Sequence, residues 1–284
     1  MSSSYRLGSN SLFTRSHENS KKPKRVVFLS TEGTKTEVQY FKFIERYKKE
    51  LEIDAIVHIE VLKRYDTNSD PENVLGLLEE FITLRDNIKF EEIVNSLNLK
   101  DYPLDFIMSY LDNPSNTNKK YNKFEETLRR EKIDLMYLYF LSKFQGENDS
   151  FGIVIDRDCG SHSIAQINNV VAKCKHKNIS YYISNPCFEF WQLLHVSDVK
   201  SEYSEVLEDI YKNELDERKN SFVSNLLYEK TNQRKSIQKK TFDEYYLPNI
   251  DFAIKRAKDF APTDKLLEHL GSNLWELFEL LRKK

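Results

Sequence analysis

The chain has 284 residues, 31% of them charged, and a formal net charge of −2, which suits one large α/β domain or two modest ones. A near-neutral chain has no global basic field for nucleic acid, so any such binding would use a local groove. Its three cysteines, Cys159, Cys174 and Cys187, lack metal-ligand spacing and fit a reducing cytosol. The longest apolar run, 135–141, is far shorter than the roughly 20 residues of a membrane-spanning helix. We therefore expect a cytoplasmic protein with no membrane contact.

The first 24 residues are polar and serine-rich and lead into the basic run "KKPKR". We expect residues 1–24 to form a flexible basic arm, either as a solvated tail or as an arm that touches phosphate. Strands are predicted at 26–31 and 54–62, with helices from residue 36 and from 69–72 to about residue 85. This β-α-β-α order predicts a parallel sheet.

Residues 87–149 interrupt that order and are interpreted as an inserted helical segment, which we expect to act in substrate choice rather than in metal binding. The pattern then resumes with strands at 151–155 and 179–184 and helices at 164–175 and 185–195. Residues 197–284 are predicted as a helical C-terminal region that closes with helices near 249–260 and 263–282. The predicted fold class is α/β, a mostly parallel sheet with flanking helices, a helical insertion and a helical C-terminal part.

Two carboxylate motifs lie where strands of the predicted sheet end. The first strand delivers Glu32 in "FLSTEG", and a later strand runs into Asp156 and Asp158 in "VIDRD". Open parallel sheets bind ligands at the carboxyl ends of their strands, so we expect the three acids to converge. Converging carboxylates repel one another unless a cation is present, and Mg²⁺ (or Mn²⁺) is the hard divalent ion that suits them. Alternation along an extended segment would place both aspartates on one side.

The residues that follow Glu32 suit a phosphate group. Gly33 leaves the backbone uncovered where a phosphate could approach, and the next helix presents free N–H groups. Lys35 lies in the same turn, either within reach of that phosphate or as a solvated lysine. Glu37 falls in the first helical turn, where a carboxylate is favourable in any case, so it is interpreted as an acid outside the direct metal ligands.

Three motifs in this order, "FLSTEGTKTEVQYF", "VIDRD" and "SNPCFEFWQLLH", resemble those of the RloB-like proteins. These are bacterial members of the TOPRIM superfamily, which includes topoisomerases, primases and the OLD-type nucleases of phage defence. The resemblance implies a TOPRIM-like core over 25–86 and 150–196, with Glu32 as its glutamate and Asp156 and Asp158 as its Asp-x-Asp. In that superfamily these acids bind Mg²⁺ and act on phosphodiester bonds, so the resemblance implies that they are catalytic.

The third motif adds candidates beyond a strand end. Asn185 is predicted to cap the following helix and to contact phosphate, with Pro186 at the first helical position. Glu189 is a candidate further metal ligand or, alternatively, an ordinary acid in a first helical turn. His195 lies on an aromatic-rich helix face and is interpreted as a packed histidine in preference to a catalyst.

Basic and aromatic residues alternate within 228–246. Lys239 and Lys240 are candidates for nucleic-acid contact in that segment, whereas a solvated helix with a buried aromatic stripe is the alternative. The sequence thus predicts a metal-dependent endonuclease that cleaves DNA or RNA, tRNA included, in anti-phage defence. A non-catalytic module that binds nucleic acid or a partner ATPase is the first alternative, since the chain has no phosphate-binding loop of its own. Strand passage or phosphotransfer is the second, and homo-oligomerisation stays open.

Overall fold

The structure is a computed structural model that describes residues 7–8, 25–54, 57–64, 70–87, 148–158 and 160–283 apart from 234–235. Between 88 and 147 it describes 89–97, 99, 101–112, 119–131, 133, 135 and 138–139. Of the predicted N-terminal arm, everything except the short strand at residues 7–8 lies outside the described residues.

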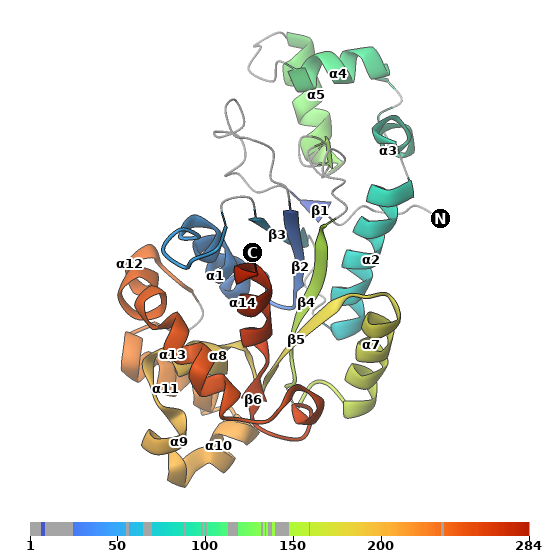
Figure 1. Ribbon diagram of the computed structural model, residues 1–284. Helices are drawn as coiled ribbons and strands as arrows, with labels where there is room; N and C mark the ends of the chain where they lie inside the picture. The colour runs from blue at the N-terminus through green and yellow to red at the C-terminus, as the bar shows by residue number, and fades with distance from the viewer. Residues whose placement is uncertain are drawn as a thin grey trace.

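A six-stranded sheet in the order β1-β3-β2-β4-β5-β6 forms the centre of the molecule (Figure 1). Its strands are β1 (Leu7–Gly8), β2 (Arg25–Thr31), β3 (Val57–Arg64), β4 (Ser150–Asp156), β5 (Ser180–Asn185) and β6 (Gly271–Ser272). The four inner strands are parallel, and the two edge strands pair antiparallel. The predicted α/β fold with a mostly parallel sheet is therefore confirmed, and it is consistent with a TOPRIM-like fold.

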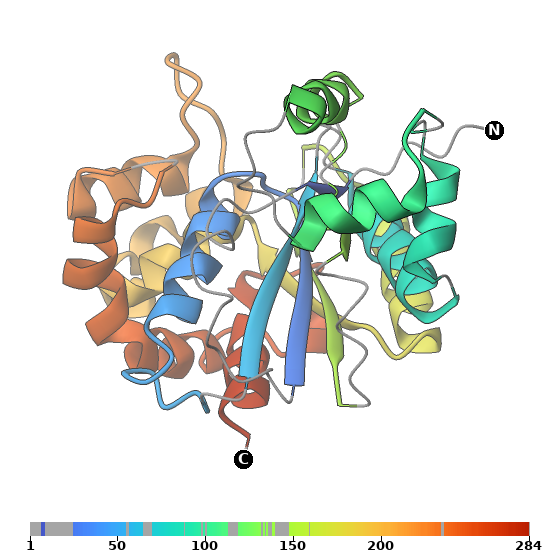
Figure 2. The same ribbon diagram turned by 90° about the horizontal axis from the view of Figure 1, so that it is seen from above.

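Both faces of the sheet are covered, which explains why its strands are continuously apolar. Successive residues of β2 alternate between two cores: Val26 and Phe28 belong to one, and Val27 and Leu29 to the other. The first core lies under α2 (Pro71–Asn87) and α7 (Ile164–His176). The second lies under α1 (Thr36–Arg46), α8 (Phe188–Val196), α13 (Ile250–Lys258) and α14 (Leu274–Arg282), on the opposite side of the sheet (Figures 1 and 2).

The C-terminal region is part of the same fold unit as the sheet, because its β6 pairs with the end of β5 and its helices share the second core. Its other helices are α9 (Val199–Glu202), α10 (Leu207–Lys212), α11 (Phe222–Thr231) and α12 (Lys239–Thr241), with a π-helix at Phe242–Tyr246 and 3₁₀ turns at Ser204–Val206, Leu247–Asn249 and Thr263–Lys265. The single helix predicted at 263–282 is wrong, since a 3₁₀ turn and β6 come before α14. β6 has only two residues and therefore no alternation that a sequence could reveal.

The helix predicted at 185–195 begins later than expected. Asn185 is the last residue of β5, the Asn185–Pro186 peptide is cis, and α8 begins at Phe188 with Cys187 as its N-cap. A residue before proline avoids helical backbone angles, so the strand continues up to the proline. The prediction that Asn185 caps the helix is therefore wrong.

The inserted segment carries α3 (Phe90–Ser96), α4 (Leu104–Asp112) and α5 (Lys119–Arg130). These helices lie beyond the amino ends of β2 and β4, at the top of Figure 1. Buried side chains of the insertion, including Ile107 and Phe124, join the core that contains Phe28. No helix among the described residues combines the length and the apolarity that a membrane crossing needs.

Candidate functional site

The carboxyl ends of β2, β4 and β5 bring acidic side chains to one edge of the sheet. Glu32 follows β2, Asp156 ends β4, and Glu189 lies in the first turn of α8, shortly after β5. The backbone N–H of Asp156 donates to Oε2 of Glu32 at 2.9 Å. The parallel pairing of β2 with β4 thus places Glu32 beside Asp156, where the two motifs were expected to meet.

Glu37 is a fourth acid at this edge. It lies in the first turn of α1, is only 5% exposed, and accepts a hydrogen bond from the backbone N–H of Gly33 at 2.9 Å. A Cβ atom on Gly33 would lie 1.9 Å from Oε2 of Glu37. The missing side chain at position 33 thus leaves the space that the Glu37 carboxylate occupies, which is a different use of glycine from the phosphate approach that the sequence suggested.

We call Glu32, Glu37, Asp156 and Glu189 the carboxylate cluster, because the charges of Glu32 and Glu189 act on both Glu37 and Asp156. Burial raises the pKa of Glu37 to about 7, with the charges of Glu189 and Glu32 adding to the rise and backbone hydrogen bonds opposing it. Burial also holds the pKa of Asp156 well above its ordinary value, and the charges of Glu32, Glu37 and Glu189 act in the same direction. The cluster is thus a concentration of negative charge that favours either protons or a cation.

His162 lies against the cluster. Its Nε2 is 3.3 Å from Oε1 of Glu32, and the two side chains are 9% and 13% exposed. The hydrogen bond with Glu32 raises the pKa of His162, burial opposes the rise, and the charges of Glu32, Asp158 and Asp70 add to it. The sequence assigned no role to His162 and placed Glu37 outside the direct metal ligands, yet both lie at the cluster. A histidine in a loop and an acid in a first helical turn carry no local signal, because His162 meets Glu32 130 residues away and Glu37 matters through its charge on Asp156.

Asp158 has a different environment from Asp156. β4 ends at Asp156, and Asp158 adopts a φ of 28°, so the extended alternation expected through the Asp-x-Asp does not continue. Its Oδ1 accepts the backbone N–H of Gly160 at 3.3 Å, and its Oδ2 accepts the hydroxyl of Ser161 at 2.7 Å. The exposed Asp158 carboxylate therefore shapes its own turn.

The cluster does not form a ready metal site as it stands. Among the described residues, no three side chains of His, Cys, Asp or Glu are arranged to hold a metal ion. In this arrangement Glu32 accepts from the backbone of Asp156 and faces His162, and Glu37 accepts from the backbone of Gly33. The donor chemistry nevertheless fits a hard divalent cation, since several oxygen ligands meet where mutual repulsion and burial disfavour their charged forms.

The predicted phosphate-binding residues lie at three different places. Lys35 is exposed at the N-cap position of α1, beside Gly33 in the turn that leads from Glu32. Asn185 is fully buried; its Nδ2 donates to the backbone oxygen of Leu266 at 2.7 Å, and its Oδ1 has no hydrogen-bond partner within the described part of the chain.

Lys239 and Lys240 lie farther away, beside the far end of α1. The Nζ of Lys239 is 5.7 Å from the ring centroid of Tyr47 and pairs with Asp243. Ten helical residues, about 15 Å, separate Glu37 from Tyr47. The structure therefore brings Lys35 to the cluster edge and leaves Lys239 and Lys240 outside it.

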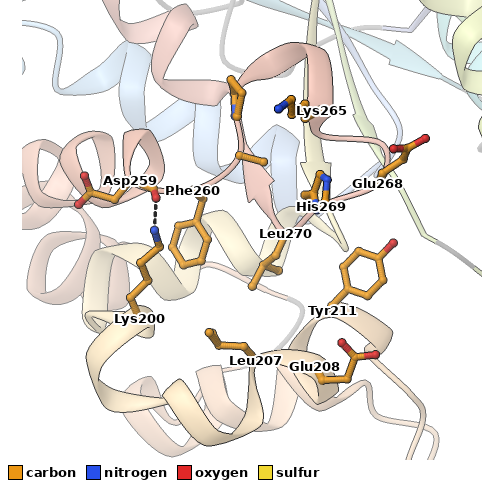
Figure 3. A pocket seen from close by; sticks show the side chains of 12 residues that line it. Lys200, Leu207, Glu208, Tyr211, Asp259, Phe260, Lys265, Glu268, His269 and Leu270 are labelled. Atoms are coloured by element: carbon orange, nitrogen blue, oxygen red, sulfur yellow. Dashed lines mark hydrogen bonds between the residues drawn. The ribbon is translucent and has the colours of Figure 1, made fainter.

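A lateral groove of about 570 Å³ lies between α9–α10 and the segment 259–270 (Figure 3). The segment adjoins the cluster through Arg157, whose Nε donates to the backbone oxygen of Leu267 at 2.9 Å. Lysines and acids alternate around the groove, namely Lys200, Lys265, Glu208, Asp259 and Glu268. Mixed charge of this kind forms no basic track for phosphates, and we assign the groove no nucleic-acid contact.

His195 is a packed residue, as its sequence context predicted. It is 1% exposed, its Nε2 is 3.0 Å from the hydroxyl of Tyr40, and its Nδ1 is 3.0 Å from the backbone oxygen of Trp191. Burial lowers the pKa of His195 to about 3, so the imidazole is neutral. Its role is to satisfy polar groups within the second core.

Comparison with known proteins gives one match over most of the chain. The family described as RloB-like protein matches residues 27–281. A curated protein of Yarrowia lipolytica, Mediator of RNA polymerase II transcription subunit 10, is 29% identical over 131 residues, which cover 45% of this chain and 89% of that protein. No solved structure matches the chain.

Proposed function

The chain belongs to the RloB-like protein family, and on that premise we propose that it is a divalent-cation-dependent nuclease of the TOPRIM type. The observation that carries the proposal is the contact between Glu32 and Asp156 across β2 and β4, with Glu37 and Glu189 acting on the same carboxylate. The substrate is nucleic acid, DNA or RNA including tRNA, and the family resemblance supports a role in anti-phage defence.

Within this proposal, Glu32, Glu37, Asp156 and Glu189 would hold Mg²⁺ or Mn²⁺, and Asp158 would join them if its carboxylate left the turn that it now shapes. A bound divalent cation would stabilise charge on a phosphodiester group and lower the pKa of water. The chain's own residues supply position and charge. Gly33 leaves room for the Glu37 carboxylate, and Lys35 places an exposed cation beside the turn through which a phosphate would approach.

The test combines cation binding with cleavage. Asp156→Asn keeps the size of the side chain but removes a charge that a cation would bind, so Mn²⁺ affinity in calorimetry should fall. Cleavage of labelled single-stranded and structured DNA and RNA should fall by about 100-fold or more, equivalent to about 3 kcal/mol. Asp105→Asn, at an exposed position of α4 in the insertion, is the matched control and should change neither quantity. Full activity in Asp156→Asn would exclude the proposed mechanism.

A second candidate function is a non-catalytic module that binds nucleic acid or a partner ATPase. It is favoured by the hydrogen-bonded state of the cluster, in which Glu32 and Glu37 accept backbone N–H groups and no described set of side chains is arranged around a cation. Such a module would bind nucleic acid equally well with and without Mn²⁺ and would cleave none. The two candidates therefore separate in one experiment, and the mass of the purified protein in solution tests homo-oligomerisation at the same time.

A further inference from the structure

Arg157, between the two aspartates of the Asp-x-Asp, has no part in the proposed chemistry, yet it is only 6% exposed. Its guanidinium makes two hydrogen bonds, one to a residue distant in sequence and one that closes a nearby loop. Nε donates to the backbone oxygen of Leu267 at 2.9 Å, and Nη1 donates to the backbone oxygen of His162 at 2.7 Å. A buried arginine that donates to two carbonyl groups fixes the backbone segments that carry them, because breaking either bond would leave a polar group buried without a partner.

The loop that Arg157 holds turns back toward the cluster. The backbone N–H groups of Ser161 and His162 both donate to the backbone oxygen of Asp158, at 2.9 and 3.0 Å. The Asp158 side chain completes the same turn through Gly160 and Ser161. As a result of this turn, the imidazole of His162 reaches Oε1 of Glu32, which lies just after the neighbouring strand β2.

Glu32 is consequently oriented by two donors, one from the last residue of β4 and one from the loop that follows it. Oε2 accepts the backbone N–H of Asp156 at 2.9 Å, and Oε1 lies 3.3 Å from Nε2 of His162. A carboxylate only accepts hydrogen bonds, so Nε2 carries the proton in this contact.

We propose that His162 is a positioning residue, which holds the Glu32 carboxylate in a fixed orientation for the cation and is itself held by Arg157. The inference rests on the proposed function, since it assigns His162 to the same site. Residues that donate to metal ligands set the orientation of those ligands, and their loss typically lowers metal affinity by about 10- to 100-fold. His162 does this from a loop whose backbone Arg157 fixes, so neither residue needs to touch the substrate.

The experiment replaces only the imidazole donor. His162→Phe keeps a ring of similar size without an N–H group, whereas His162→Gln places an amide Nε2 donor near the position of the imidazole Nε2. Calorimetry with Mn²⁺ should show that His162→Phe lowers the affinity by about 10-fold or more. His162→Gln should restore most of the lost affinity. His176→Phe, at the exposed end of α7, is the matched control and should bind Mn²⁺ as the parent does.

A second measurement needs no cation. Thermal melts of the metal-free parent, His162→Phe, Glu32→Gln and the double variant form a double-mutant cycle, and the shift of the double variant should be smaller than the sum of the single shifts. Additive shifts together with parental Mn²⁺ affinity in His162→Phe would overturn the inference and leave the proposed function standing. A parent that binds no Mn²⁺ would defeat the proposed function itself, and the positioning role with it.

Discussion

Glycine at position 33 and the glutamate four residues later form one structural feature. The Glu37 carboxylate folds back over Gly33, accepts its N–H, and occupies the space of an absent Cβ. Because the clash that a methyl group would cause is with the end of a flexible side chain, the fold can tolerate a change at Gly33 by moving Glu37. A substitution at Gly33 should therefore affect cation binding more than it affects stability.

Gly33→Ala should displace the Glu37 carboxylate from the cluster and lower Mn²⁺ affinity, by about 10-fold if Glu37 is a ligand or fixes one. The melting temperature should change little. Gly76→Ala is the matched control, because nothing lies within 4 Å of a Cβ there and Gly76 is inside α2. Alanine in that helix should raise stability by about 0.5–1 kcal/mol and leave Mn²⁺ affinity unchanged. Unaltered Mn²⁺ affinity in Gly33→Ala would remove Glu37 from the site.

The raised pKa of Glu37 predicts how the metal-free protein responds to pH. Its pKa rises from an ordinary value of 4.5 in the unfolded chain to about 7 in the folded one, so the folded state binds the proton more tightly. Stability from this group is therefore complete below about pH 4.5 and is lost as the pH rises through about 7, by up to about 3 kcal/mol. Asp156 acts in the same direction. Melts between pH 5 and pH 8 should show the decline, and Glu37→Gln should flatten it; a melting temperature that rises over this range would contradict the assignment.

At the scale of elements, the inserted helices lie beyond the amino ends of the inner strands, whereas the carboxylate cluster lies at their carboxyl ends (Figure 1). The insertion joins β4 at its amino end, and the seven residues of β4 span about 20 Å before Asp156. An element at that distance does not help to build the cluster. The earlier expectation that the insertion selects the substrate would then require a nucleic acid long enough to reach from one edge to the other.

Replacing residues 89–147 by a short glycine-serine linker should leave Mn²⁺ affinity unchanged, because the cluster lies at the other edge. The melting temperature should fall, since the core that contains Phe28 and Ile153 loses buried side chains of the insertion such as Phe124. Calorimetry below the new melting temperature tests the first point. Lost Mn²⁺ affinity in a variant that still shows the parental circular dichroism of the core would mean that the insertion supports the cluster.

At the scale of the whole molecule, local patterns predicted the strands and the acids, and contacts distant in sequence decided the rest. The apolar run before Glu32 and the "VIDRD" strand gave β2 and β4, and parallel pairing then placed Glu32 beside Asp156. The two-residue β6 and the approach of His162 to Glu32 depend on partners distant in sequence, up to 130 residues away for His162. No local periodicity encodes such partners.

The near-neutral chain also predicts how nucleic acid would bind. With a formal net charge of −2, attraction to phosphates must come from individual exposed lysines rather than from the protein as a whole. Adjacent lysines on α12 offer a direct comparison. Lys239 is paired with Asp243, whereas Lys240 has no acidic partner within the described residues.

Lys35→Ala and Lys240→Ala should each weaken binding and reduce the slope of log affinity against log salt concentration by about 1, the change expected for one lost phosphate contact. Lys239→Ala should reduce it less, because Asp243 already neutralises that charge. None of the three variants should alter Mn²⁺ affinity, since none of these lysines belongs to the carboxylate cluster. Filter binding at several salt concentrations gives the slopes. Equal slopes for Lys35→Ala and the parent would mean that phosphates reach the cluster by a path that avoids the start of α1. Equal slopes for Lys240→Ala and the parent would mean that α12 does not contact the nucleic acid.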